Sequence, residues 1–225
     1  MHYFCIPYRD SEFSGGKYRR AFEKFKPYFR DYLKHNNYKF SIIYVEQIQD
    51  KNLFKTGKLN NVGFDLCKQF FNIKDGDVFA HHPVDQMPID VDYSVLQECN
   101  LIFDARRDYP KVHIFKVEAY KKINGYSNDY EGWGHEDTDM MERLKICNIS
   151  TANTFYNFEA LACNGTGITD GPGNYSPKYD ENWKILDELK NSKNIYYSGL
   201  NTLSYKSLNF KETDSNEYHC LVDIY

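Results

Sequence analysis

The chain has 225 residues, with 28 basic and 32 acidic side chains and a formal net charge of −4. This length suits one substantial domain and is too short for two domains of ordinary size. Hydrophobic residues make up 41% of the chain, which is enough for a buried core. Acidic and basic residues are mixed along the sequence, whereas nucleic-acid binding needs a clustered basic surface. We therefore predict one globular domain without a nucleic-acid partner.

Targeting signals and cysteines narrow the class of protein further. No apolar run approaches the length that spans a bilayer, and residues 3–7 show no signal-peptide pattern. We therefore expect no membrane span and a cytoplasmic location. No CxxC or Cys/His zinc spacing occurs, which predicts reduced and mostly buried thiols. The six cysteines are Cys5, Cys67, Cys99, Cys147, Cys163 and Cys220.

The N-terminal residues predict a strand followed by a long helix. Residues 2–7 form the expected strand, and residues 17–35 the helix, because apolar residues recur there at helical spacing. Pro27 interrupts this helix, so we expect a kink or a split. The apolar face comprises Tyr18, Ala21, Phe22, Phe25, Phe29 and Leu33.

A second strand–helix–strand pattern follows. Residues 40–46 are β-branched and aromatic, which predicts a buried strand. Residues 58–71 predict a helix, residues 75–77 a turn, and residues 78–81 a short strand that ends just before Asp85. The residues expected to face inward from the helix are Leu59, Val62, Leu66 and Phe70.

This alternation predicts an open, mostly parallel α/β sheet. Ligands of such sheets bind beyond the carboxyl ends of the strands, which is where Arg9 and Asp85 fall. In the second half, four glycines and two prolines within residues 164–177 predict a mobile loop. Residues 183–189 predict a short helix, and the chain closes with strand-like segments.

Residues 132–137, with the sequence Gly-Trp-Gly-His-Glu-Asp, are the most informative stretch. The glycines permit a tight turn around Trp133, whose face offers an apolar platform for a sugar ring. The Asp137 carboxylate beside that platform can accept a proton from a sugar hydroxyl. The alternative interpretation is an acidic helix start after a glycine turn, because carboxylates are favourable at helix N-termini.

Several further segments stand in a recognisable order around this stretch. Together they resemble the β-1,4-galactosyltransferase family and its N-acetylhexosaminyltransferase relatives. The resemblance implies one catalytic domain with the nucleotide-sugar-binding GT-A fold, in which residues 1–100 bind the donor and residues 101–225 the acceptor. The segments that carry it are residues 7–10, 44–47, 54–63, 81–88, 123–130 and 198–205.

On the donor side, the resemblance implies that a loop surrounds the uracil and phosphates of UDP. Arg9 can bind phosphate through its planar fork, and a salt bridge at the surface is the alternative. The family's phosphate-facing Arg is missing from residues 54–56, where Lys55 or Lys58 are possible substitutes. The donor-binding residues implied in this way are Pro7, Tyr8, Arg9, Asp10, Phe54, Val84 and Asp85.

For the metal, the family uses Asp-Val-Asp where this chain has Pro83-Val84-Asp85. The resemblance makes Asp85 a ligand of Mn²⁺, whereas the first acid is lost. The alternative interpretation of Asp85 is a residue of the turn at the strand end, with no role in metal binding. A literal Asp-Val-Asp at residues 90–92 is a second candidate metal site. The family's Met-x-x-His pair is absent. Residues at or near the altered site are Cys163, Thr166, His81, His82 and His135.

On the acceptor side, the resemblance implies that Asp137 is the general base of an inverting transfer. Glu136 would bind an acceptor hydroxyl or N-acetyl group, and Trp133 would support the sugar. His135 replaces the usual Gly, which predicts added bulk beside the base. We expect Asp139 to cap or charge the helix.

For Tyr126 and Tyr130 the sequence leaves two alternatives open, a core aromatic residue or a wall of the binding pocket. The stretch that precedes a Gly-Gly pair in the family governs donor choice, and residues 108–111 lack that pair, so the donor sugar is not predicted.

These residues predict an inverting glycosyltransferase that moves a hexose or N-acetylhexosamine from a UDP-sugar to a hydroxyl of a glycan acceptor. Two alternatives remain. One is a related GT-A polysaccharide or polypeptide N-acetylhexosaminyltransferase. The other is a non-catalytic nucleotide- or sugar-binding relative with a degraded metal site.

Overall fold

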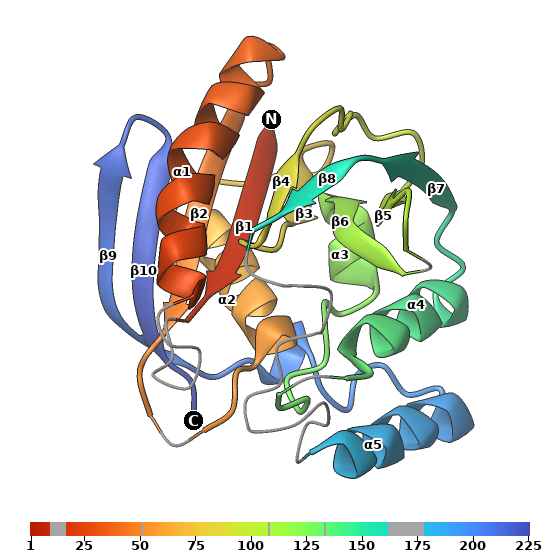
Figure 1. Ribbon diagram of the computed structural model, residues 1–225. Helices are drawn as coiled ribbons and strands as arrows, with labels where there is room; N and C mark the ends of the chain where they lie inside the picture. The colour runs from red at the N-terminus through yellow and green to blue at the C-terminus, as the bar shows by residue number, and fades with distance from the viewer. Residues whose placement is uncertain (10–16, 51, 108, 133, 162–177) are drawn as a thin grey trace.

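The computed structural model describes residues 1–9, 17–50, 52–107, 109–132, 134–161 and 178–225. A central sheet of eight strands has the order β7-β5-β6-β3-β1-β2-β10-β9, and β4 and β8 pair separately (Figure 1). The strands are β1 (His2–Tyr8), β2 (Phe40–Gln47), β3 (Val78–His81), β4 (Gln86–Pro88), β5 (Cys99–Asp104), β6 (Pro110–Lys116), β7 (Thr151–Tyr156), β8 (Phe158–Ala160), β9 (Lys206–Asp214) and β10 (Glu217–Asp223). The helices are α1 (Lys17–His35), α2 (Thr56–Phe70), α3 (Val117–Lys122), α4 (Glu136–Ile146), α5 (Tyr179–Ser192) and the short 3₁₀ helix η2 (Leu200–Thr202).

The direction of the strands decides where a ligand site can form. Strand β1 runs parallel to β2 and β3, and β10 is parallel to β2, as β7 is to β5. Strands β6 and β9 are antiparallel to their neighbours. Consequently β6 begins at the edge of the sheet where β1 and β3 end. The sheet uses strands from both halves of the chain, and the division into donor and acceptor halves stays a prediction.

Helix α1 covers one face of the sheet. Ala21, Phe25, Phe29 and Leu33 are buried, as their spacing predicts, and pack with alternate residues of β1 and β2. Of the expected kink or split at Pro27, the split does not occur, because α1 runs unbroken from Lys17 to His35. Pro27 is exposed, so the buried face of the helix supplies the packing that keeps it continuous.

Helix α2 covers the opposite face, together with α3 and α4. Leu59, Val62 and Leu66 are buried, as predicted, and pack against Cys5 and Val45 in the second core cluster. Phe70 was wrongly predicted to face inward. It is 53% exposed and stacks on Phe210 of β9, with 4.1 Å between ring centroids. The last turn of α2 lies at the sheet margin, where only β9 remains for the ring to contact.

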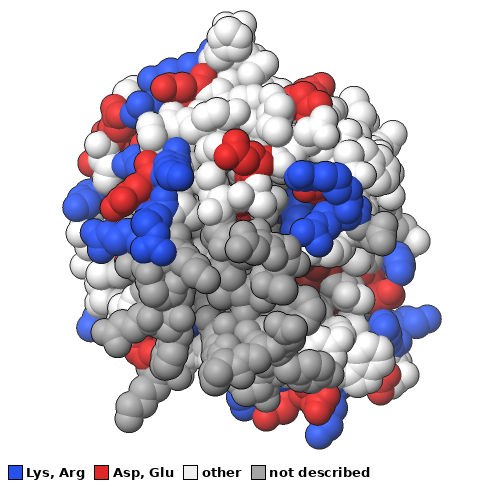
Figure 2. Space-filling view, viewed as in Figure 1, with Lys and Arg blue, Asp and Glu red and all other residues white. Residues whose placement is uncertain are grey.

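The predicted order of the first five elements is confirmed, and helix α5 is longer than the predicted residues 183–189. The predicted loop at residues 164–177 lies outside the described residues. Within the part of the chain that the structure describes, no helix has the length and apolarity to cross a membrane. Basic and acidic side chains are interspersed on the face shown in Figure 2. The cellular location stays a prediction.

Thiols among the described residues are free, as the scattered cysteines predict. Cys5, Cys67, Cys99 and Cys220 are buried, and Cys147 is half-buried. Burial raises the pKa of Cys5, Cys67 and Cys99, because a thiolate is poorly solvated in the core. These thiols therefore act as small apolar core residues.

Candidate active site

Helices α4 and α5 lie toward the edge of the sheet to which β1 points (Figure 1). His81, the last residue of β3, pairs with His113 of β6. The His113 Nδ1 atom lies 3.9 Å from Oδ1 of Asp137, in the first turn of α4. The ends of β1 and β3, the start of β6 and the start of α4 thus converge, as parallel α/β sheets predict for a ligand site.

A glycine turn leads into α4. The Gly132 N–H donates to the Phe54 carbonyl at 2.9 Å, which holds the turn against the predicted donor side. Gly134 has φ +120°, and a Cβ atom there would lie 2.9 Å from the Tyr179 ring of α5. Only glycine fits this backbone at so close an approach. Trp133 lies outside the described residues.

His135 stands where the resemblance implies Gly, and added bulk beside the base stays a prediction. Its φ is +72°, in the left-handed region, which explains why the family favours Gly at this position. The ring packs on α5, 4.5 Å from the Tyr179 centroid and 5.0 Å from that of Trp183. Burial lowers the pKa of His135. The His135 ring therefore packs the turn against α5.

Asp137 combines solvent access with an unfavourable setting for its charge. The side chain is 37% exposed, so the carboxylate opens toward solvent on one side. Desolvation raises its pKa, and the negative charge of Glu136 raises it further, whereas the Lys111 ammonium lowers it. Desolvation also raises the pKa of Glu136, whose Oε2 accepts from the Gly134 N–H at 3.0 Å. Two carboxyl groups therefore share one recess, each poised to hold a proton more tightly than an exposed acid does.

Beneath Asp137 lies a buried pair of imidazoles. His113 Nδ1 lies 2.5 Å from the Tyr126 hydroxyl, and the rings of His81 and His113 are 5.6 Å apart. Burial lowers the pKa of His81 to about 4 and that of His113 well below its ordinary value. Both are therefore neutral at physiological pH. Tyr126, left open by the sequence, is a core residue whose hydroxyl reaches the floor of the site.

Asp85 lies in the turn after β3 and is half-buried. Desolvation raises its pKa, and the Lys111 ammonium lowers it. Lys111 also lowers the pKa of Asp137, so its charge acts on both predicted carboxylates. That Asp85 and Asp137 belong to one site stays a prediction. The Asp85 carbonyl accepts from the Leu161 N–H at 2.8 Å, so the chain that leaves β8 passes beside this turn.

On the predicted donor side, Arg9 is buried and forms a salt bridge with Asp50, so the salt bridge that was its alternative is present, although it is largely buried. Its Nη1 donates to the Asn52 carbonyl at 2.6 Å and lies 3.7 Å from Asp50. The guanidinium carbon is 5.8 Å from the Phe54 ring centroid. Arg9 therefore adjoins Phe54, whose carbonyl holds the Gly132 turn.

The other predicted donor residues have core positions or lie outside the description. Pro7 pairs with β2, Tyr8 is buried and stacks on Phe22 of α1, and Val84 belongs to the same core cluster. Asp10 lies outside the described residues. A donor role for these four residues stays a prediction.

Lys55 and Lys58, the predicted substitutes for the missing Arg, both have internal partners. Lys55 Nζ lies 2.6 Å from the Glu131 carboxylate, and Lys58 Nζ donates to the Tyr225 carbonyl at 2.6 Å. Both line a polar pocket of about 480 Å³ that also contains Asn128. The ammonium groups of Lys55 and Lys58 therefore already have partners within the protein.

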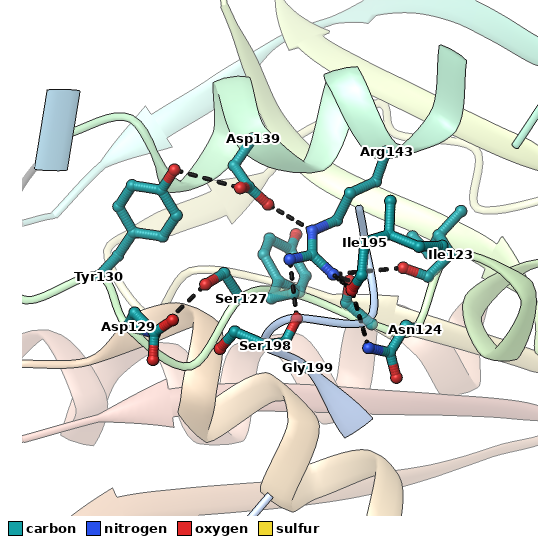
Figure 3. A network of polar contacts seen from close by, with 12 residues as sticks. Ile123, Asn124, Ser127, Asp129, Tyr130, Asp139, Arg143, Ile195, Ser198 and Gly199 are labelled. Carbon is teal, nitrogen blue, oxygen red and sulfur yellow. Dashed lines mark hydrogen bonds and ion pairs between the residues drawn. The ribbon is translucent and has the colours of Figure 1, made fainter. Parts of the chain in front are cut away.

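The sequence led us to expect that Asp139 caps or charges the helix. In the structure Asp139 makes no capping hydrogen bond. It is buried and forms an ion pair with Arg143, which also donates to the carbonyls of Ile123, Ile195 and Ser198 (Figure 3). Tyr130 donates to Asp139 at 3.1 Å, so this ring too is internal. Two of the segments that carry the family resemblance, residues 123–130 and 198–205, are thus locked together behind α4.

The same two segments are joined by asparagine side chains. Asn124 Nδ2 donates to the Ile195 carbonyl and to Asn201 Oδ1, at 2.9 and 2.6 Å. Asn128 Nδ2 donates to the Gly199 carbonyl at 2.7 Å. Through these contacts, residues 123–130 and 198–205 form a scaffold that supports the start of α4.

The residues that the structure describes contain no group of three or more His, Cys, Asp and Glu side chains able to hold a metal ion. Asp85 is a single carboxylate ligand, and Cys163 and Thr166 lie outside the described residues. The alternative Asp90-Val91-Asp92 serves loop structure, because Asp90 accepts from Asn157 and Asp92 from Ser94 and Tyr38. The described donor set therefore does not fit a complete Mn²⁺ site.

Comparisons with known proteins bear on the family and the fold. Residues 95–160 match the family described as the N-terminal domain of galactosyltransferase. The chain is 25% identical over 213 residues to β-1,4-galactosyltransferase 7 of Drosophila melanogaster, covering 87% of this chain and 62% of the relative. The crystal structure of the catalytic domain of the Drosophila enzyme with xylobiose matches with a TM-score of 0.75 and 21% identity, over 100% of this chain and 94% of that chain. These matches support a distant relationship between the chain and the β-1,4-galactosyltransferase family.

The structural match confirms the predicted GT-A fold, a single α/β domain with a mostly parallel sheet. A mutant of the Drosophila galactosyltransferase, in complex with manganese, UDP-Gal and xylobiose, has the same fold, with a TM-score of 0.74 and 20% identity over 100% of this chain and 94% of that chain. The chain spans 62% and 59% of the length of the first curated galactosyltransferases it matches.

Two residues of this galactosyltransferase-like site were missed in the sequence. Lys111 and His113 stand on β6, which no strand pattern assigned to the site. The missing Gly-Gly pair at residues 108–111 was the available signal for Lys111. His113 gives no comparable signal, because its position under Asp137 depends on the antiparallel pairing of β6 with β3.

Proposed function

We propose that this protein is an inverting glycosyltransferase that moves a hexose or N-acetylhexosamine from a UDP-sugar to a hydroxyl of a glycan acceptor. The relatives named above are galactosyltransferases, and one related structure holds UDP-Gal with xylobiose. UDP-galactose and xylosides are therefore the first donor and acceptors to test.

In the proposed reaction, the acceptor oxygen attacks the anomeric carbon while its proton passes to the Asp137 carboxylate. The new C–O bond forms as the bond to the diphosphate breaks, and the electron pair leaves with UDP. A single displacement from the opposite face inverts the anomeric configuration. Glu136, whose carboxylate the Gly134 N–H orients, is proposed to bind the acceptor beside the base.

The observation that carries the proposal is the setting of Asp137. Its carboxylate is solvent-accessible and has a raised pKa, and the charge of Lys111 acts on it as well as on Asp85. A base needs access to the substrate and a pKa near the working pH, and desolvation supplies the second condition. The family's manganese stays a prediction for this chain, and when bound it would neutralise charge on the diphosphate.

A screen of UDP-sugars for UDP release tests the proposal, with glycan and peptide acceptors in separate arms. Asp137→Asn is expected to lower turnover by about 10²–10⁴-fold, as loss of a general base does. Asp187→Asn, on the exposed side of α5, is the matched control and should leave turnover unchanged. NMR of the product should show an anomeric configuration opposite to that of the donor.

A non-catalytic relative is the second candidate, because Lys55 and Lys58 are engaged by Glu131 and Tyr225 where the family has a phosphate-facing Arg. It predicts UDP release equal to that of buffer with every donor, and no effect of Asp137→Asn. Transfer to peptides alone would instead favour the polypeptide N-acetylhexosaminyltransferase alternative.

A further inference from the structure

Lys111 occupies an irregular position at the start of β6. The pairing of β5 with β6 shifts register there, because Ile102 pairs with Val112 whereas Phe103 pairs with Pro110. Lys111 is thus the extra residue of a β-bulge, a feature that redirects a side chain and often adjoins an active site. It lies two residues before His113, which contacts Asp137, and beyond the end of β3, from which the Asp85 turn departs.

The charge of Lys111 is available to a ligand. Its Nζ lies 4.4 Å from the Tyr109 ring centroid and 3.5 Å from the Tyr109 hydroxyl, and it forms no ion pair with a carboxylate of the described residues. The other basic residues near the predicted donor side differ. Arg9 is held by Asp50, and Lys55 by Glu131.

The rest of the site is unfavourable for an anion. Glu136 and Asp137 stand side by side in the first turn of α4, and desolvation raises the pKa of both carboxyl groups, so negative charge is poorly solvated there. A departing diphosphate is a multiply charged anion and needs a cation in such a place. The described residues supply Lys111 but no group of ligands that would hold a divalent metal.

We propose that Lys111 is a catalytic residue whose ammonium binds the diphosphate between Asp85 and Asp137, so that UDP binding and sugar transfer proceed without a divalent metal. This inference rests on the proposed function. As the anomeric C–O bond breaks, its electron pair moves to the diphosphate oxygen that Lys111 faces, while the acceptor proton goes to Asp137.

Titration calorimetry with UDP, in EDTA and separately in Mn²⁺, tests the inference without relying on turnover. The parent protein should bind UDP in EDTA. Lys111→Met should weaken that binding by about 10-fold or more, the size expected for a charged hydrogen bond. Lys111→Arg should retain most of the affinity. Lys116→Met, at the opposite end of β6, is the matched control and should bind UDP as the parent does.

Sugar transfer in EDTA should follow the same order among these variants. UDP binding by the parent only in Mn²⁺, or equal binding and transfer by Lys111→Met and the parent in EDTA, would overturn the inference while the proposed function stands. Loss confined to UDP-glucuronic acid would overturn it as well, because Lys111 would then read a sugar carboxylate. Failure of every variant to bind UDP, with or without Mn²⁺, would overturn both proposals.

Discussion

In helix α4, Arg143 donates to Asp139 one turn earlier, with 2.5 Å between Nε and Oδ1, and each side chain is only 2% exposed. The guanidinium also reaches the Ser198 carbonyl at 2.8 Å (Figure 3). The turn of helix that carries Asp137 is therefore fastened to the C-terminal segment through a buried charge pair.

Arg143→Met should strongly destabilise the protein, because it leaves the Asp139 carboxylate buried without its cation. We expect the free energy of unfolding to fall by about 3–5 kcal/mol, measured by urea denaturation followed by circular dichroism. Arg106→Met is the matched control. Arg106 pairs with Asp104, but its side chain is 64% exposed, so the loss there should be about 1 kcal/mol or less.

The double variant Asp139→Leu, Arg143→Met separates the ion pair from the carbonyl contacts. Replacing a buried pair by apolar side chains is often nearly neutral. In this double variant the free energy of unfolding should recover only in part, because the carbonyls of Ile195 and Ser198 lose their hydrogen-bond donor. Full recovery of stability would contradict the structural role assigned to Arg143.

Asp137→Asn should stabilise the fold while it lowers turnover. The folded-state pKa of Asp137 is raised above that of an unfolded Asp, so the folded protein binds the proton more tightly. Ionisation therefore costs stability as the pH rises through that window, and the cost persists above it. We expect Tm to rise by a few degrees at pH 8, with a smaller difference as the pH falls toward 4.

Calorimetric scans across this pH range check the sign, with Asp187→Asn as the exposed control. A stabilisation that grew toward acidic pH would contradict the raised pKa. The partial exposure of Asp137 limits the size of the effect, because solvent screens part of the repulsion from Glu136.

Much of the first half of the fold was predictable because its signals are local. The buried faces of α1 and α2 follow from spacing within each helix, and the short strand at Val78–His81 from its neighbours in sequence. Phe70 continues the α2 stripe but lies against the edge strand β9, where it stays exposed, and periodicity carries no information on where the sheet ends. Asp85 and Asp137 were placed at one edge by the parallel-sheet rule and the family resemblance.

The interior of the site was less predictable because it depends on long-range pairing. Lys111 faces the site only because β6 runs antiparallel to β3 and carries a bulge. Asp139 and Arg143 have the i, i+4 spacing of an ion pair on a helix surface. This spacing does not reveal that both side chains are buried. Their burial requires residues 123–130 and 198–205 to close over α4.

The pH dependence of transfer should report the two charges that act on Asp137. The base must be ionised, so turnover should rise with pH through an apparent pKa above the ordinary range of Asp. Glu136→Gln removes a negative neighbour and should move this rise in turnover to lower pH. Lys111→Met removes a positive neighbour and should move it to higher pH. Initial rates between pH 4 and 9 measure both shifts, and movement in the same direction would contradict the arrangement.

Gly134→Ala should impair both stability and turnover, because the added methyl meets the Tyr179 ring at 2.9 Å on a backbone with φ +120°. The turn can relieve this contact only by moving the start of α4, and Asp137 moves with it. Gly76→Ala separates the two causes: φ is +88° there, and nothing lies within 4 Å of the added Cβ. The control should lose about 1 kcal/mol by backbone strain and keep full UDP-sugar turnover. Gly134→Ala should lose more stability in urea denaturation and at least about tenfold in turnover, since small misplacements of a reacting group cost that much or more. Equal losses in the two variants would show that the contact with α5 does not position the base.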